Sequence, residues 1–340
     1  MNKRKNWIDW MKALSMLFIV WGHLFPDRMT NFLYAFNVPV FFVISGFLQK
    51  DKGRCRKGYI VAALKSLLLP YVVICSTYLI LNSFFLYQAG DLTVANYLRS
   101  IIYIFAGFQS CPHGIGSSAM WFVYTLLIIK IVFYVIDDWR WLGVIAVLCL
   151  CGTMFSKGHP LFWSVQNVLI SFPFFYLGWL LANKEEAWFN KITNGIKLNT
   201  EQFRIVTIML VVLGLFVVYR IGEHNGLAKM YECQFGNSLG LFLTGGVLGT
   251  VVVYLISLSL DSLTFPWVKT LSVGSIVILG YQYYPIKVYG LVMMIDKLAP
   301  YKHNGFLTLV YSFLVMWLFV FVIKVVQRHF PIILGGRKVE

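Results

Sequence analysis

The chain has 340 residues, of which 59% are apolar, 17% aromatic and only 13% charged. A soluble globular protein carries about 45–50% apolar and about 25% charged residues, so this chain has about half the charge that a water-exposed surface needs. The composition excludes a soluble enzyme, a disordered chain and a disulfide scaffold. We therefore expect an integral membrane protein in contact with lipids. In a soluble protein its net charge of +15 would suggest a nucleic-acid partner. In a membrane protein basic cytoplasmic loops explain this charge better, so we expect no nucleic-acid partner.

Ten segments are apolar enough to be interpreted as membrane spans, at about 20 residues per crossing. The apolar stretch Tyr97 to Phe108 is only about half a span and is predicted to be re-entrant or interfacial. The fold class predicted is an all-α integral membrane protein with about ten transmembrane helices in a single domain, residues 1–340. The predicted spans are Ile8 to Phe25, Leu33 to Leu48, Tyr59 to Tyr87, Ser117 to Ile136, Trp141 to Phe155, Trp163 to Ala182, Ile205 to Tyr219, Ser238 to Leu260, Thr270 to Met294 and Gly305 to Gln327.

Basic residues fall unequally on the two sides that these spans define. With a cytoplasmic N-terminus, 17 of the 29 Lys and Arg residues lie in cytoplasmic segments and 7 on the opposite side, and 5 lie within or at the ends of spans. Cytoplasmic loops collect Lys and Arg. We therefore expect both termini to be cytoplasmic.

The predicted first span carries three ionisable residues, Asp9, Lys12 and His23. At about 100° per residue they fall on one stripe of the helix, with His23 about 16 Å beyond Lys12. Ionisable groups inside a span are costly and mark candidate functional sites, and a neutral imidazole can accept a proton near pH 7. The alternatives are that Lys12 snorkels to the interface beside Asp9 and that His23 is an interfacial histidine near the outer surface.

The predicted second span contains Pro39, which cannot donate a backbone hydrogen bond and therefore frees the carbonyl of Ala35. In hydrocarbon such a break survives only where it lines a cavity or packs on protein. Asn37 and Ser45 add polar contacts, and Gly46 permits a close helix approach. The segment is interpreted either as a packing kink or as part of a site.

These two spans together resemble the multi-spanning acyltransferase family 3, and within it the fucose 4-O-acetylase-like branch. Two positions depart from the pattern, because Asn37 and Gln282 stand where this branch often has histidines, and neither side chain can act as a base near neutrality. The resemblance rests on Asp9-x-x-Lys12 followed by His23, on Asn37-x-Pro39-x-Phe41-Phe42-x-x-Ser45-Gly46, on Lys65 before Leu68-Leu69-Pro70-Tyr71, on Met120-Trp121-Phe122-Val123 and on Gly274 to Leu279.

The resemblance implies an enzyme of the bacterial inner membrane that O-acylates cell-envelope or surface glycans. Its donor would be cytoplasmic acetyl-CoA or another short acyl-CoA, which suits the basic cytoplasmic side, and its acceptor a glycan or lipid-linked sugar. No CxxC spacing indicates a metal site, and no metal is expected. The implied catalytic residues are His23, Lys12 and Asp9; the donor-binding candidates are Lys12, Lys65, Arg54, Arg56 and Lys57; the substrate-binding candidates are Asn37, Ser45, Trp121 and Gln282.

Several alternatives stay open at this point. The basic loop from Lys50 to Lys57 can serve orientation only, and Trp121 can be an interfacial belt residue. A covalent route through His23 or Ser45 competes with direct transfer. A multi-spanning transporter of a glycan or lipid would also bury Lys, Asp and His residues, and a non-catalytic membrane sensor is a third class.

Overall fold

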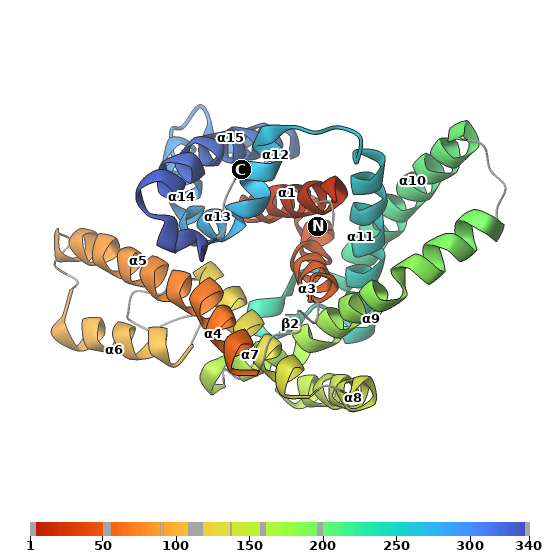
Figure 1. Cartoon of the computed structure of the whole chain (residues 1–340). Helices are drawn as coiled ribbons and strands as arrows, with labels where there is room; N and C mark the ends of the chain where they lie inside the picture. Colours follow the sequence, from red (N-terminus) through yellow and green to blue (C-terminus); the bar gives the residue numbers. More distant parts are fainter. Residues whose placement is uncertain are drawn as a thin grey trace.

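The structure is a computed structural model that describes residues 5–49, 56–88, 90, 92–107, 118–136, 138–156, 161–195 and 200–336. Helices make up most of the described chain (Figure 1). The α-helices are α1 (Asn6–Gly22), α2 (Thr30–Tyr34), α3 (Asn37–Phe47), α4 (Arg56–Ala63), α5 (Leu69–Gln88), α6 (Val94–Phe105), α7 (Trp121–Val135), α8 (Trp139–Phe155), α9 (Val165–Gly195), α10 (Thr200–Asn225), α11 (Leu239–Ser259), α12 (Pro266–Val273), α13 (Ser275–Tyr281), α14 (Tyr283–Val292) and α15 (Gly305–His329).

Short elements connect these helices. A small antiparallel hairpin pairs β1 (Ala228–Lys229) with β2 (Gln234–Phe235), with Ala228 opposite Phe235. A π-helical turn, η1, joins α4 to α5. The short helical turns are η1 (Leu64–Leu68), η2 (Ser118–Met120), η3 (Phe162–Ser164), η4 (Met230–Glu232), η5 (Ala299–Tyr301) and η6 (Pro331–Leu334).

Six helical segments of the described chain are long and apolar enough to cross a membrane, which confirms the predicted all-α membrane class. Two helices are shorter than their predicted spans, since α1 has 17 residues and α7 has 15, whereas α8, with 17 residues, begins two residues earlier than predicted. The stretch predicted to be re-entrant or interfacial forms α6, whose 12 residues are too few to cross. The six segments are Thr30–Phe47, Gly58–Gln88, Val165–Ala182, Glu201–Asn225, Leu239–Ser259 and Gly305–His329.

The predicted span Thr270 to Met294 is not one helix but three, interrupted at Gly274 and at Gln282. Pro285 follows the second interruption and cannot bond to the carbonyl of Tyr281, so the helix ends at that residue. The backbone of Gln282 still donates to the Ile278 carbonyl over 2.9 Å. The interruption therefore reorients the chain without leaving the Gln282 N–H unpaired.

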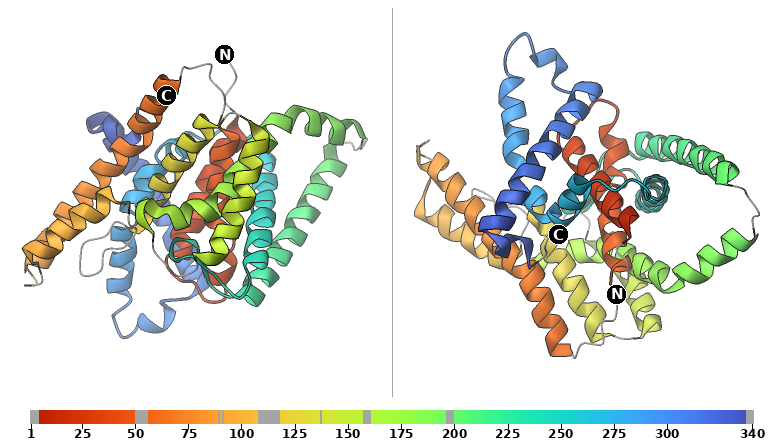
Figure 2. Two further views of the ribbon diagram at one scale, coloured as in Figure 1. Left: turned by 90° about the horizontal axis from the view of Figure 1, so that it is seen from below. Right: turned by 45° about the horizontal axis from the view of Figure 1, so that its top comes forward.

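The outer helices expose large apolar side chains, as lipid contact requires. Phe313, Trp317 and Phe321 project from one side of α15, and Met209 and Phe216 project from α10. A soluble monomer rarely exposes apolar patches of this extent. Figure 2 shows α9 and α10 diverging at one edge of the molecule, with α5 and α6 at another.

Helix α1 is the centre of the packing. It lies against α3, α11, α12 and α15, and 12 of its 17 residues are buried (Figure 1). At its start the Trp7 N–H donates to the Asp261 carboxylate over 2.7 Å, which satisfies one of the free amides of a helix N-terminus. Near its end the Trp21 indole donates to the Thr308 hydroxyl of α15 over 3.0 Å. Both ends of α1 are thus fixed.

Helices α3 and α9 pack so closely at two glycines that no larger side chain fits there. A Cβ atom on Gly46 would overlap the carbonyl oxygen of Phe175, and one on Gly178 would overlap that of Val43. The prediction that Gly46 permits a close helix approach is therefore confirmed, and its partner is α9. Small residues at such contacts let helix backbones pack directly.

We expect Gly46→Ala to destabilise the protein by about 1–3 kcal/mol, because the added methyl group forces α3 and α9 apart. The matched control is Gly290→Ala on α14, where a Cβ meets nothing within 4 Å. Thermal unfolding of the two variants in detergent tests this expectation. An unchanged midpoint for Gly46→Ala would contradict the close packing described here.

Candidate functional site

A cavity of about 160 Å³ lies where several helices end inside the protein. Four of the residues predicted from sequence, far apart in the chain, line it together. The lining residues are Ile19, His23, Tyr34, Asn37, Val38, Ala119, Trp121, Phe122, Ala228, Met230, Tyr231, Leu279 and Gln282.

The polar lining residues stand at helix ends. His23 follows the last residue of α1, Asn37 is the first residue of α3, Trp121 the first of α7, and Gln282 separates α13 from α14. A helix that stops in the middle of a membrane protein is tolerated where it lines a cavity. The interruption before Asn37, which Pro39 predicts, and the one at Gln282 meet at the same place.

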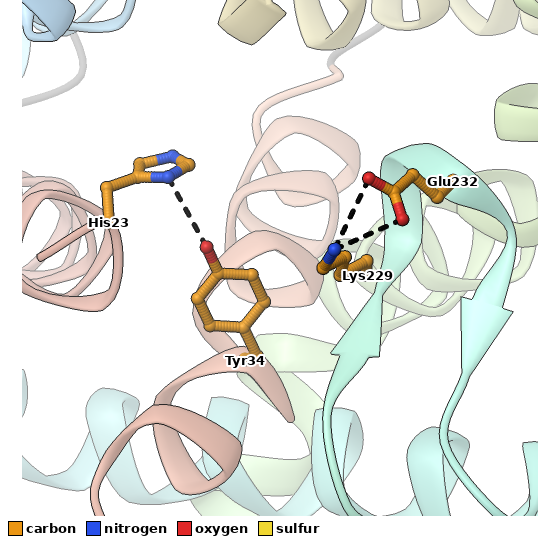
Figure 3. Close-up of polar contacts among 4 residues, drawn as sticks. All are labelled: His23, Tyr34, Lys229 and Glu232. Atoms are coloured by element: carbon orange, nitrogen blue, oxygen red, sulfur yellow. Dashed lines mark hydrogen bonds and ion pairs between the residues drawn. The ribbon is translucent and has the colours of Figure 1, made fainter. Parts of the chain in front are cut away.

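His23 has a defined partner in the cavity. Its Nδ1 lies 3.3 Å from the phenol oxygen of Tyr34, the last residue of α2 (Figure 3). In the tautomer with the proton on Nδ1, the imidazole donates to Tyr34 and leaves Nε2 free to accept a proton. Gly22 makes room for this arrangement, because a Cβ there would lie 3.1 Å from the Tyr34 ring and 3.3 Å from the Asn37 amide.

The connection between α10 and α11 supplies another wall of the cavity. Ala228, Met230 and Tyr231 of the hairpin face the lining residues of α1 and α3. Beside them Lys229 and Glu232 form an ion pair of 3.3 Å, and Figure 3 shows the Tyr34 phenol between this pair and His23. The side chains of Lys229 and Glu232 do not line the cavity.

Two protonated side chains of this connection bear on the chemistry. The pKa of the Tyr231 phenol is raised, mainly by burial and secondly by a hydrogen bond to Glu232. This group therefore stays a hydrogen-bond donor near neutrality. Burial also raises the pKa of the Cys233 thiol to about 12. A thiol reacts as its thiolate, so Cys233 is no nucleophile at pH 7. His23 lines the cavity and stays the predicted base.

The side-chain amide of Gln282 is buried and has no hydrogen-bond partner within the described part of the chain. The residue is 3% exposed, and neither Oε1 nor Nε2 has a partner among the described residues. A buried polar group left unpaired costs about 1–3 kcal/mol. In the cavity wall such an amide is available to a ligand.

Trp121 is buried and held by aromatic neighbours rather than placed in an interfacial belt. Its ring centroid lies 6.4 Å from that of Phe42 and 6.3 Å from that of Phe122. Its place in the cavity wall supports the interpretation as a site residue.

The other predicted residues whose side chains the structure describes do not line the cavity. Asp9 is buried and Lys12 half-buried in the first half of α1, and Ser45 is half-buried near the end of α3. Lys65 is exposed on η1, away from the protein interior. Arg54 lies outside the described residues, as do the side chains of Arg56 and Lys57 at the start of α4. No metal-binding group of three His, Cys, Asp or Glu residues occurs in the described ranges.

Sequence reasoning missed Tyr34 and the hairpin. Tyr34 and Asn37 are three residues apart just before Pro39, so a polar pair at helical spacing was a usable signal. Gly226 and Gly236, both with positive φ, bracket the hairpin and mark a compact turn. Nothing in the sequence indicates that this turn contacts the first two predicted spans.

The fold and the cavity define a multi-pass membrane protein with an internal histidine site. The chain belongs to acyltransferase family 3: the family model described as an acyltransferase domain matches residues 5–328. It is therefore a membrane acyltransferase of the type that acts on carbohydrate-type acceptors, and the predicted family and enzyme class are confirmed. No curated protein and no solved structure matches the chain. The likeness to the fucose 4-O-acetylase-like branch stays a prediction.

We expect Tyr34→Phe to lower the rate of acyl transfer about two- to tenfold, the range that one hydrogen bond accounts for. The ring and its stacking on Phe25 are kept, with centroids 6.1 Å apart, so thermal stability should change little. Initial rates and unfolding midpoints of the purified variant test this expectation. A rate equal to that of the unmodified protein would show that the phenol does not orient His23.

Proposed function

We propose that this acyltransferase moves an acetyl group from acetyl-CoA, or a short acyl group from another acyl-CoA, to a hydroxyl of an envelope or surface glycan sugar. The observation that supports this proposal most directly is a histidine with one free ring nitrogen in a cavity with aromatic and amide walls. Membership of an acyltransferase family favours this function over a transporter or a sensor.

The transfer proceeds in one step. The acceptor oxygen forms a bond to the thioester carbonyl carbon while its proton moves to Nε2 of His23. The carbon–sulfur bond breaks, and the imidazolium returns the proton to the sulfur of CoA, so the products are the sugar ester and free CoA. Positioned general-base catalysis of this type contributes about 10²–10⁴-fold. Tyr34 orients the imidazole, which in the tautomer with the proton on Nδ1 presents Nε2 to the acceptor.

The donor enters from the cytoplasmic side. In this proposal the chain crosses the inner membrane of a bacterium about ten times, with both termini in the cytoplasm. Asp9 and Lys12 then lie near the cytoplasmic end of α1, about 21 Å and about 16 Å from His23 along its axis. These distances let the nucleotide stay among basic side chains while the acyl end reaches the cavity. The basic residues proposed for the donor are Lys12, Lys65, Arg54, Arg56 and Lys57.

The acceptor occupies the cavity. Trp121 provides a buried aromatic wall, and the amides of Asn37 and Gln282 provide hydrogen bonds to sugar hydroxyl groups. The acceptor is a glycan or a lipid-linked sugar.

His23→Ala should lower acyl transfer about 10²–10⁴-fold, because the general base is lost, while membrane expression stays unchanged. The matched control is His224→Ala, which removes an exposed imidazole of α10 outside the cavity. The measurement is the transfer of label from radioactive acetyl-CoA to envelope glycans in isolated membranes. Full transfer by His23→Ala would remove this residue from the mechanism, and no transfer by the unmodified protein would favour the transporter.

Ser45→Ala should keep acyl transfer within about twofold of the unmodified rate. Ser45 lies eight residues beyond Asn37, about 12 Å along α3, and is not part of the cavity wall. It is therefore too far from His23 to carry the acyl group. A burst of acyl-enzyme that disappears in Ser45→Ala would instead establish the covalent route.

A further inference from the structure

The walls of the cavity are uncharged. Among its described lining residues there is no Asp, Glu, Lys or Arg. The nearby charges of the hairpin, Lys229 and Glu232, compensate each other in an ion pair of 3.3 Å. Transfer of an unpaired charge into such a site is costly. The cavity thus disfavours an anionic ligand, although the chain as a whole carries a net charge of +15.

The size of the cavity limits what it can hold. Its volume of about 160 Å³ is below the 300–1,000 Å³ that is usual for drug-sized ligands. A single sugar ring is compatible with this space, and several linked rings are not. The rest of a longer glycan must stay outside the cavity.

Among the described residues of this wall, Gln282 has the side chain with the most unused hydrogen-bond donors and acceptors. It is 3% exposed, and both of its polar atoms lack partners among the described residues. An amide donates two hydrogen bonds through nitrogen and accepts two through oxygen. Two neighbouring hydroxyl groups of a sugar ring offer the complementary donor and acceptor.

We propose that the acceptor ring is an uncharged sugar and that Gln282 selects it by hydrogen bonding to hydroxyl groups beside the one that is acylated. This inference rests on the proposed function and adds the class of sugar and the residue that reads it. A site built to bind a hydroxyl group rejects an analogue without it, because its buried polar group is then left unpaired.

The first experiment compares acceptors that differ in one group. Purified protein in nanodiscs is given labelled acetyl-CoA and nitrophenyl glycosides of neutral hexoses, each paired with its hexuronic acid counterpart, which carries a carboxylate at C6. We expect the best neutral acceptor to exceed its acidic counterpart at least about tenfold in kcat/KM. Equal use of the two would overturn the inference that the ring is uncharged.

The second experiment replaces Gln282. The unmodified protein should discriminate about 10- to 100-fold between the best neutral acceptor and its deoxy analogue that lacks the hydroxyl read by Gln282. In Gln282→Leu this discrimination should fall to about onefold, so that the two acceptors are used equally. The reason is that activity on the acceptor with all its hydroxyl groups falls to the level of the deoxy analogue. The unfolding midpoint should stay the same or rise, because an unpaired buried amide is replaced by an apolar group.

The matched control is Thr125→Val on α7. The Thr125 hydroxyl is also buried without a partner among the described residues, but it does not line the cavity. This variant should keep its stability and the full discrimination between acceptors. If Gln282→Leu discriminates as strongly as the unmodified protein on every deoxy analogue, Gln282 does not select the acceptor.

These measurements distinguish an error in the proposed function from an error in the role of Gln282. If the unmodified protein transfers label to no glycoside and to no component of a mixed envelope glycan extract, the proposed function itself is wrong. If transfer occurs but Gln282→Leu behaves like Thr125→Val, only the role of Gln282 is wrong.

Discussion

The site depends on one constraint of the membrane environment: a helix can end inside the protein only where its free backbone groups are satisfied or face a cavity. Here α1, α2, α3, α7 and α13 all end or begin around the same small space. Side chains at these ends point inward because the helices stop there. The cavity and its polar lining thus have the same physical cause.

Much of this arrangement could be predicted from local sequence. Apolar length gave the membrane class, and Pro39 indicated the interruption before Asn37. His23 stood out because an ionisable group in a span is costly. The weaker predictions concerned helix length: the run from Thr270 to Met294 is apolar enough for one span, but Pro285 interrupts it at Gln282. A hydropathy pattern counts apolar residues and does not register such a break.

The rest of the site depends on contacts between distant parts of the chain. Met230 and Tyr231 reach the cavity only because α10 and α11 hold the hairpin against α2 and α9. Tyr34 pairs with His23 because the turn between α1 and α2 folds back on α1. Such contacts have no local signature. Lys65 differs from these residues, since its side chain is exposed on η1 and the packing of the protein does not place it in the cavity.

The two ends of α3 have different structural roles. Gly46 fixes the helix against the backbone of α9, and Asn37 faces the cavity about two and a half turns away. A substitution at position 37 leaves the backbone contact of Gly46 untouched, so the chemistry of the wall can change while the scaffold keeps its shape. The architecture therefore lets new ligand preferences arise by single exchanges at helix ends, at little risk to the rest of the protein.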